Sequence, residues 1–565
     1  MSLGFVRFFR REPCRASGIP LTWESFCGPL ASPVCSLYSV CSLWGWEFYG
    51  TGVGFHRELL ESRSRFYVKT SSKPILRFLL ISSLFYFFSY PGVDNDLWGH
   101  LFFGKEILQS GGLPLNNLYS FTAPDHPWIN HEWLAEVIFY GIFYFFGSPG
   151  LILLKVLIGA MIVWILDLII KQRATSPFVR VLTLVWTMVI LSPGFNIRPQ
   201  LFTYLFLAGL LFLFYRFEKE DKPVLTWVPL FMLLWVNLHG GFVAGLGALG
   251  LFSLVTLLST ARRGLADSQA INRLAIPLAL SLAVLFVNPY GIALLFFLWR
   301  DLLLSRPITE WGAIALFDFS FLEFKLALVF VLLFSVGKGY YRRWDFILCC
   351  LAALFSIRYQ RHTPLFAILA APLMAEGVQK MSHRIERDVR EWMLAFGIMV
   401  LGLYMLQGVG RIHLEHRFRL VVNPLEYPSQ AVNFLQRNGI RGNLAVPFDW
   451  GEYFIWKLYP DIRVSIDGRY TTSYPMEVIQ DHWDWMEGNK GWRKLLERYP
   501  AEIAITNRYH PVTALLRKDP EWLYLYSDPI AFVFVRKTPS QEGLLAKFKE
   551  RRLLPPQTPP VYFPG

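Results

Sequence analysis

The stretch Pro91–Trp133, PGVDNDLWGHLFFGKEILQSGGLPLNNLYSFTAPDHPWINHEW, decides how the rest of the chain is interpreted. It is polar, acidic at its start and rich in His and Trp, and it directly follows the apolar run Pro74–Tyr90. That run has the length and composition of a membrane span. Ionisable groups at membrane depth cost free energy, so they usually have partners or a function. We therefore expect a functional site in this loop.

The composition places the chain among membrane proteins. Of its 565 residues, 54% are hydrophobic and 17% aromatic, and the mean hydropathy is +0.36. The apolar residues form blocks of roughly 15 to 25, enough to cross the hydrocarbon core. The formal net charge of +13 could indicate nucleic acid. Because Lys and Arg lie between apolar blocks, we interpret them as a topology signal and expect no nucleic-acid partner.

The apolar blocks predict about eleven spans: 74–90, 150–170, 178–194, 201–216, 225–239, 241–260, 274–298, 321–337, 344–357, 362–379 and 392–410. With the N-terminus inside, the basic clusters fall in inner loops, and the long outer loop 92–149 holds only Lys105. This distribution follows the positive-inside rule. The segment His131–Gly147 resembles a further span, but counting it would invert every later loop. We therefore expect it, like Leu97–Gln109, to be a helix at the outer surface.

The chain divides into four parts by composition. Residues 1–72 are expected to form a cytoplasmic or surface extension, and 73–410 the transmembrane domain. In 411–540 charges return and apolar runs shorten, which predicts an extracytoplasmic α/β domain, and 541–565 is a Pro-rich tail that is expected to be extended from Pro555. Strands are predicted at Leu444–Phe448, Val464–Ile466, Ile503–Thr506, Trp522–Tyr526 and Phe532–Arg536, and helices at Ser429–Arg437 and Glu452–Tyr459. The fold class is thus a polytopic α-helical protein of the cytoplasmic (inner) membrane, with an α/β domain outside it.

This topology brings polar residues from separate spans to the side of Asp94, Asp96 and His100. They are Asn196, Arg198, Gln200, Asn237, His239, Asn288, Arg358, Arg361 and His362. Acids gathered beside arginines suggest a site for an anionic headgroup next to a base, because guanidinium groups suit phosphate oxygens.

Each candidate also has a structural interpretation. Asp96 precedes a predicted helix and could be its N-cap as well as catalytic. Asp94 could be a solvated turn residue, and His100, one helical turn from Asp96, either orients that carboxylate or is an interfacial His. Arg198 could be an anchor that snorkels to the interface, and Arg358 and Arg361 could anchor lipid headgroups. Asn237 and His239 could form a turn at Gly240-Gly241, and His131 with Glu132 could cap a helix.

Two groups of motifs carry a resemblance to a known family. Asp96-Leu97-Trp98-Gly99-His100 is similar to the first-loop acidic motif of oligosaccharyltransferase catalytic subunits. The segment 448–453, Phe-Asp-Trp-Gly-Glu-Tyr, followed by 466–469, Ile-Asp-Gly-Arg, resembles their W-W-D-Y-G motif and the D-G-N stretch after it. Phe448 and Glu452 depart from that pattern. The surface helices also resemble those of protein O-mannosyltransferases and aminoarabinose transferases, and D-x-D-x-W-x-H with W-G-E-Y is similar to uncharacterised bacterial members.

The resemblance implies the GT-C class of membrane glycosyltransferases, which use polyprenyl-phosphate-linked sugars. It implies substrate binding by Asp449, Glu452, Tyr453, Asp467 and Arg469. A divalent cation (Mg or Mn) is possible because oligosaccharyltransferases use one, although no strong metal-ligand spacing is present in this sequence. Membrane lipid, the lipid-linked donor and a glycan, lipid or protein acceptor are the implied partners.

The expected chemistry is inverting sugar transfer on the outer face of the membrane. Asp96 would act as general base, tuned by Asp94 or His100, while Arg198, Arg358 or Arg361 stabilises the departing phosphate. Asn237, His239 and His362 would also line the substrate site. Two alternatives remain open: a transporter or flippase of lipid-linked saccharides, and a non-catalytic assembly protein. Convergence of Asp96, Arg198 and Arg361 in one cavity would favour the enzyme.

Overall fold

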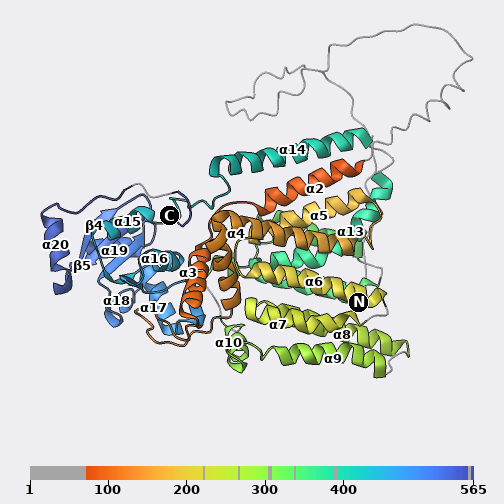
Figure 1. Ribbon diagram of the computed structural model, residues 1–565, viewed down its shortest axis with the longest axis horizontal. Coiled ribbons are helices and arrows are strands. Elements are labelled where there is room, and N and C mark those ends of the chain that lie inside the picture. Colours follow the sequence, from red (N-terminus) through yellow and green to blue (C-terminus); the bar gives the residue numbers. More distant parts are fainter. Residues whose placement is uncertain are drawn as a thin grey trace, which may run out of the picture. The chain divides into compact units, whose positions relative to one another are not determined.

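The computed structural model describes residues 72–220, 223–264, 268–302, 304, 308–335, 339–385, 391–557 and 561–564. All of them belong to one compact unit, Ser71–Gly565. A bundle of helices is followed along the chain by an α/β domain (Figure 1). The extension predicted for 1–72 lies, apart from Ser72, outside the described residues.

All but one of the predicted spans coincide with helices of the bundle. The helices are α2 (Ser72–Phe88), α3 (Asn95–Ser110), α4 (Trp133–Ile170), α5 (Pro177–Leu191), α6 (Gln200–Lys219), α7 (Val228–Leu238), α8 (Phe242–Arg262), α9 (Ser268–Val284), α10 (Ile292–Leu302), α11 (Leu322–Ser335), α12 (Trp344–Arg358), α13 (Thr363–Ile385) and α14 (Glu391–His416). Among the described residues, 5 helical segments are long and apolar enough to cross a membrane, in α4, α5, α6, α8 and α14. The count of about eleven spans therefore stays a prediction.

The span predicted at 274–298 is wrong, because the chain turns between α9 and α10. The turn contains Asn288-Pro289-Tyr290-Gly291. The side chain of Asn288 accepts a hydrogen bond from the Tyr290 N–H at 2.8 Å, and Gly291 has a φ of +53°. An Asx turn, a proline and a left-handed glycine together end a helix. The apolar composition of the segment concealed this break.

The surface helix predicted before residue 150 exists as a separate rod. Helix α4 is kinked at Gly147, where φ is 61° and ψ is −156°, and Pro149 follows. The part before the kink turns alongside α3 (Figure 1). A Cβ at Gly104 would lie 2.2 Å from the Glu136 carbonyl oxygen, so only glycine allows this close approach. The place of this rod relative to the membrane remains a prediction.

The α/β domain is built on one five-stranded sheet in the order β2-β1-β3-β5-β4. Its strands are β1 (Gly442–Ala445), β2 (Ile462–Val464), β3 (Ile503–Asn507), β4 (Trp522–Ser527) and β5 (Ala531–Arg536). Strand β1 runs parallel to β2 and β3, whereas β5 is antiparallel to β3 and β4. All five predicted strands are confirmed within a few residues.

The helices of this domain were predicted less completely than its strands. Two of them, α15 (Ser429–Arg437) and α16 (Gly451–Leu458), match the predicted helices. Four were not predicted: α17 (Met476–Met486), α18 (Lys494–Arg498), α19 (Val512–Lys518) and α20 (Glu542–Lys549). Helix α20 lies in the segment 541–565 assigned to the tail, before Pro555, where the extended part was expected to begin.

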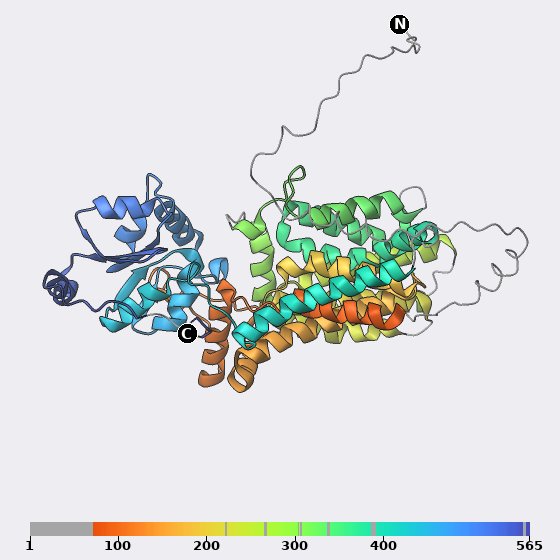
Figure 2. The same ribbon diagram turned by 90° about the horizontal axis from the view of Figure 1, so that it is seen from above.

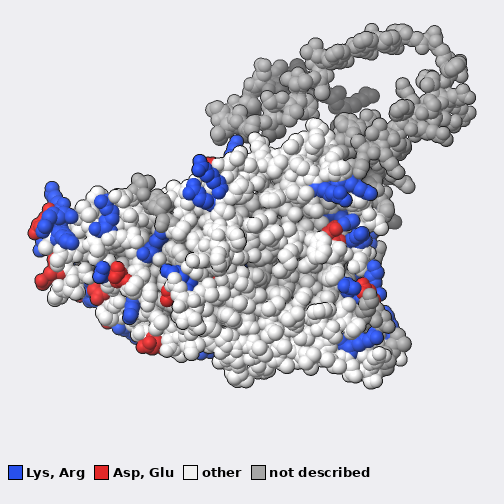
Figure 3. Space-filling model, in the orientation of Figure 1, with Lys and Arg blue, Asp and Glu red and all other residues white. Residues whose placement is uncertain are grey.

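The bundle has two chemically different ends. Arg173, Arg343, Asp345 and Glu376 form ion pairs where α4 and α6 finish and α12 begins, here called the basic end. The acid end is where α6 begins and where α3 contacts α16. On the face shown in Figure 3, charged side chains gather over the α/β domain and at the far ends of the helices, with an uncharged surface between them. Such a band suits lipid contact.

Candidate functional site

Helix α3 begins at the acidic pair. Asp94 is its N-cap residue, and the Asp94 Oδ1 atom accepts a hydrogen bond from the Asp96 N–H at 3.1 Å. The interpretation of Asp96 as the N-cap is therefore wrong, because Asp94 satisfies the exposed helix donor instead. Asp96 follows in the first turn, where its carboxylate is free to face other groups.

Three carboxylates converge on the guanidinium of Arg198, which lies in the loop between α5 and α6. Its Nε atom is 2.5 Å from Asp94 Oδ1, and its Nη1 atom is 3.1 Å from Asp96 Oδ2 and 2.9 Å from Glu310 Oε1. Asn196 donates to Asp94 Oδ2 at 3.3 Å. We call Asp94, Asp96, Arg198 and Glu310 the acid cluster. Asp94 is thus held by an ion pair and is not a solvated turn residue.

Glu310 was not predicted from the sequence. It lies in η4 (Thr309–Trp311), a short helical turn between α10 and α11. The sequence did offer one signal for Glu310. It is an acid in a polar break between two apolar blocks, and the predicted topology puts that break on the same side as Asp94 and Asp96. This signal was weak because Glu310 is far from Arg198 in the sequence, and only the packing of the helices brings the two together.

The carboxyl group of Asp96 has a raised pKa. Burial raises its pKa to about 6, and the negative charges of Asp94 and Glu310 add to the rise, against the lowering effect of Arg198 and His100. Its side chain nevertheless keeps 35% of its surface exposed. A reachable carboxylate with a pKa close to working pH has the properties of a general base.

The α/β domain brings a second carboxyl group to Asp96. Glu452, near the start of α16, accepts a hydrogen bond from the Gly99 N–H at 3.2 Å. A Cβ placed on Gly468 would lie 2.7 Å from Glu452 Oε1 and 3.3 Å from Asp96 Oδ1. Burial and then the charge of Asp96 raise the pKa of Glu452 well above its usual range, which favours its neutral form. The three sequence motifs therefore meet at one point.

The glycines of these motifs have a steric explanation. A Cβ on Gly99 would lie 2.3 Å from Glu452 Cδ, and one on Gly451 would lie 2.1 Å from the Ile466 carbonyl oxygen. A larger residue at Gly99 would displace the Glu452 carboxyl group, and one at Gly451 would force the start of α16 away from the backbone at Ile466. The adjacent Trp98 is fully buried, and its ring centroid is 4.8 Å from that of Tyr453. Tyr453, predicted to bind substrate, is therefore placed in the core beneath the acid cluster.

Asp467 and Arg469 form a buried ion pair beside the first loop. Arg469 donates to both carboxylate oxygens of Asp467 at 2.8 and 2.7 Å, and the Tyr474 hydroxyl donates to Asp467 at 2.5 Å. Arg469 also donates to Asn117 at 2.9 Å, and its guanidinium lies 4.7 Å from the Trp128 ring centroid. With 0% and 7% exposure, the pair is placed to join the first loop to the α/β domain.

His100 pairs with an acid on the neighbouring rod. Its Nδ1 atom is 3.6 Å from Glu136 Oε1, and Asn130 donates to the other Glu136 oxygen at 2.6 Å. Burial disfavours the imidazolium, but the carboxylate of Glu136 and the nearby acids Glu132 and Asp96 outweigh this and raise the pKa of His100. His100 thus acts on Asp96 through its charge, and its close partner is Glu136.

A second polar group surrounds Glu132, the N-cap residue of α4. The Glu132 side chain makes no cap hydrogen bond; its Oε1 atom lies 3.7 Å from His131 Nε2 and 3.5 Å from His239 Nε2. His239 also accepts a hydrogen bond from the Gly241 N–H at 3.0 Å, which confirms the turn. Asn237 accepts from Trp133 Nε1 at 3.2 Å and so fastens α7 to α4.

Arg361 connects this second group to the acid cluster. Its charge acts on Glu132 and on Tyr204, and the Tyr204 hydroxyl is also under the influence of Arg198 and Glu310. The guanidinium lies 4.6 Å from the ring centroid of Trp311, the residue after Glu310. The sequence therefore correctly assigned Asp96, Arg198 and Arg361 to one end of the bundle.

The remaining predicted residues lie around the same place. The His362 ring is 6.2 Å from Trp311, and the guanidinium of Arg358, an exposed residue, is 4.6 Å from the Tyr359 ring. Asp449, in η7 (Phe448–Trp450), is subject to the charges of Arg198 and Glu310, and burial raises its pKa. Asn288 forms the turn between α9 and α10 described above.

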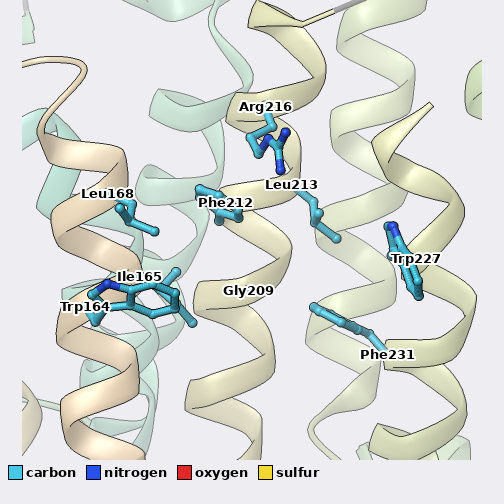
Figure 4. Close-up of a pocket in the computed structure, with 9 residues that line it drawn as sticks. All are labelled: Trp164, Ile165, Leu168, Gly209, Phe212, Leu213, Arg216, Trp227 and Phe231. Carbon is cyan, nitrogen blue, oxygen red and sulfur yellow. The ribbon is translucent and has the colours of Figure 1, made fainter. Parts of the chain in front are cut away.

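The hollow shown in Figure 4 is separate from this site. It has a volume of about 480 Å³ and is lined by Trp164, Ile165, Leu168, Gly209, Phe212, Leu213, Arg216, Trp227 and Phe231. Arg216 is on the last turn of α6, roughly 24 Å along the helix from its first residue. The lining is almost entirely apolar, so this groove lacks the groups that sugar chemistry needs.

The acid cluster is not arranged as a metal centre. Among the described residues, no group of three or more His, Cys, Asp and Glu side chains is placed to hold a metal ion. The carboxylates of Asp94, Asp96 and Glu310 instead meet at a guanidinium, which already supplies the positive charge. A divalent cation would have to displace Arg198 from these oxygens.

Comparisons with known proteins identify the fold. No protein-family model and no curated protein sequence matches the chain. The chain is similar to the crystal structure of the Archaeoglobus fulgidus oligosaccharyltransferase in the apo form, with a TM-score of 0.51 and 10% identity over 78% of this chain and 70% of that one. A cryo-EM structure of the arabinofuranosyltransferase AftD from Mycobacteria also matches, with a TM-score of 0.48 and 12% identity over 83% of this chain and 40% of AftD.

The archaeal oligosaccharyltransferase is the one of these two structures whose TM-score carries a fold comparison. The likeness to the archaeal enzyme shows that this chain has a glycosyltransferase fold of the GT-C type, as the sequence resemblance indicated. With its apolar helices it is a multi-pass membrane protein. At this level of identity the shared property is the fold, and activity must be argued from the residues.

Proposed function

We propose that this chain is a glycosyltransferase that moves a sugar from a polyprenyl-phosphate-linked donor to an acceptor hydroxyl or amide at the acid end of the bundle. The observation that carries the proposal is the convergence of Asp96 with Arg198 and Glu310 on a GT-C fold. Clustering at one end of the helices fits a reaction site better than a translocation path or a scaffold. The acid end would face the outside of the cytoplasmic membrane, as the positive-inside rule predicts.

Asp96 is the general base in this proposal. Its carboxylate takes the proton from the acceptor as the acceptor atom forms a bond to the anomeric carbon. The bond between that carbon and the donor phosphate oxygen breaks, and the electron pair leaves with the lipid phosphate. One displacement of this kind inverts the anomeric configuration. General-base assistance contributes about 10²–10⁴ in rate.

Arg198 has a positioning role in this scheme, because Asp94, Asp96 and Glu310 already occupy its donors. Removing Arg198 would leave three carboxylates facing one another without compensation. The departing phosphate is better assigned to Arg361 and Arg358, whose guanidinium groups lie over aromatic rings. Phosphate binding by a guanidinium uses two parallel N–H donors.

Analysis of lipid-linked sugars tests the proposal. In a strain lacking the protein, a polyprenyl-phosphate sugar should accumulate and a surface glycan should lose that sugar. Wild-type protein should reverse both changes, whereas Asp96→Asn should reverse neither at equal membrane abundance. Asp461→Asn, at an exposed acid of the α/β domain, is the matched control and should restore both. Restoration by Asp96→Asn would remove the base from the mechanism.

A further inference from the structure

Residues 561–564 lie against the acid loop although they are far from it in sequence. The C-terminal end of the chain lies close to α3 in Figure 2. These residues belong to a segment that composition assigned to an extended tail. Both the backbone and the side chains of these residues make defined contacts with the rest of the chain.

The backbone contacts form a short ladder with Leu420–Val422 in the middle. On one side the Val422 N–H donates to the Val561 carbonyl at 2.8 Å, and the Phe563 N–H donates to the Leu420 carbonyl at 3.0 Å. On the other side Val421 exchanges hydrogen bonds with Pro91 and Val93, at 2.8 and 3.2 Å. The ladder therefore ends one residue before Asp94, the N-cap of α3.

The side chain of Phe563 enters the core behind the acid cluster. It is 4% exposed, and its ring centroid is 4.4 Å from that of Trp98 and 5.4 Å from that of Phe143. The Phe563 carbonyl accepts a hydrogen bond from Ser148, next to the kink of α4, at 3.4 Å. One residue thus touches α3 and both sides of the α4 kink.

The neighbours of Phe563 hold the segment from the other side. The Arg419 guanidinium lies 3.8 Å from the Tyr562 ring centroid, and Lys457 of α16 donates to the Pro564 carbonyl. The Lys457 ammonium is also 5.6 Å from the Trp98 ring. Trp98 lies two residues after Asp96, so the packing that fixes this indole also fixes the direction of the first turn of α3.

We propose that residues 561–564 are a latch that positions the acid loop, with Phe563 as the positioning residue acting through Trp98. The latch joins the loop before Asp94, the first turn of α3 and the kink of α4 into one body. Because it docks as a short segment into a site formed by the rest of the chain, a peptide of the same sequence should replace it. The inference concerns local order and holds whether or not the chain transfers sugar.

Hydrogen exchange on the full chain in detergent or nanodiscs tests the latch. Phe563→Ala should raise exchange of the amides in 91–99 on the order of 10²–10³-fold, the effect of deleting a buried phenyl ring. Exchange in β3 and at the basic end should stay unchanged. Val561→Ala, at a side chain that is 47% exposed, is the matched control, and Phe563→Leu should restore most of the protection.

A purely structural residue would raise exchange throughout the fold, and that result would overturn the latch. Unchanged exchange in 91–99 would overturn it as well. If Phe563→Ala does not accumulate, Phe563→Leu still gives a graded result. In addition, a chain ending at residue 557 should regain protection in 91–99 when a peptide of residues 558–565 is added. The same peptide carrying Phe563→Ala should have no effect; equal protection by both peptides would contradict the proposal.

Discussion

The two charged groups at opposite ends of the bundle differ in their charge balance. At the basic end, Arg173 and Arg343 face Asp345 and Glu376, and the hydroxyls of Tyr215 and Tyr340 donate to these acids at 2.8 and 2.9 Å. Two positive groups and two negative groups satisfy one another. A network of this kind, in which every charged group has a partner, stabilises the folded state.

The acid cluster has no such balance. Arg198 faces Asp94, Asp96 and Glu310, and Glu452 and Asp449 add further carboxyl groups nearby. Burial and, after it, the neighbouring acids raise the pKa of Asp96 to about 6, against the lowering effect of Arg198. The comparison teaches that the basic end is built for stability, while the acid end keeps a carboxylate in a state suited to proton transfer.

The largest expected effect is the loss of sugar transfer when Asp96, at the acid end, is replaced. Asp96→Asn should lower the rate of sugar transfer by about 10²–10⁴-fold, because it removes the proton acceptor. The melting temperature in detergent should change little. Rates are compared at equal amounts of folded protein, with Asp461→Asn as control. Loss of activity together with loss of folding would make Asp96 a structural residue like those of the basic end.

The reverse behaviour is expected of Asp345, which is 2% exposed. Asp345→Ala should lower the free energy of unfolding by about 3–5 kcal/mol, because Arg173 and Arg343 lose a buried partner. The rate per folded molecule should be unaffected. Denaturant unfolding in detergent measures this, and Asp318→Ala, at an exposed pair with Lys325, should lower the free energy of unfolding far less than Asp345→Ala does. Equal losses from the two substitutions would remove the distinction between the ends.

The pH dependence of transfer probes the raised pKa of Asp96. Because an aspartic acid must be deprotonated to act as a base, activity should be full above the pKa and fall as the pH drops through about 6. Well below that point the rate should fall about tenfold per pH unit. Initial rates between pH 5 and pH 8 test this. A rate that stays constant through pH 6 down to pH 5 would contradict it.

A smaller effect is expected at Glu310, whose negative charge helps to raise the pKa of Asp96. Glu310→Gln removes that charge, so the anionic form of Asp96 becomes easier to reach and the midpoint should move to lower pH by a fraction of a unit. The same rate measurements detect it. Glu477→Gln, at a side chain 67% exposed, should leave the midpoint in place, and an upward shift in Glu310→Gln would contradict the charge arrangement.

The smallest expected effect is that of a chelator. EDTA should leave the transfer rate unchanged, because Arg198 occupies the position between the carboxylates that a divalent cation would take. Membranes or purified protein dialysed against EDTA and then supplied with Mg²⁺ or Mn²⁺ provide the measurement. A rate that collapses on chelation and returns with Mn²⁺ would show that the cluster rearranges around a metal ion.

Most of the bundle could be predicted from the sequence, because apolar blocks of spanning length leave few alternatives to a helix. The distribution of Lys and Arg in the loops distinguished the helix before Gly147 from the membrane span after it. The strands β1–β5 followed from short β-branched and aromatic runs. The break between α9 and α10 was missed because the turn residues Asn288–Gly291 lie in apolar surroundings, and α17 was missed because its helical pattern is short.

The sequence also determined which acids and arginines share the acid end, since the direction of successive helices follows from their order and charges. Only the tertiary structure decided what each does there. It made Asp94 the N-cap, paired His100 with Glu136, buried Asp467 with Arg469, added Glu310 to Arg198 and placed Phe563 behind Trp98. The contacts of His100, Glu310 and Phe563 join residues far apart in the chain, and they depend on side-chain packing between elements, which no local pattern of residues encodes.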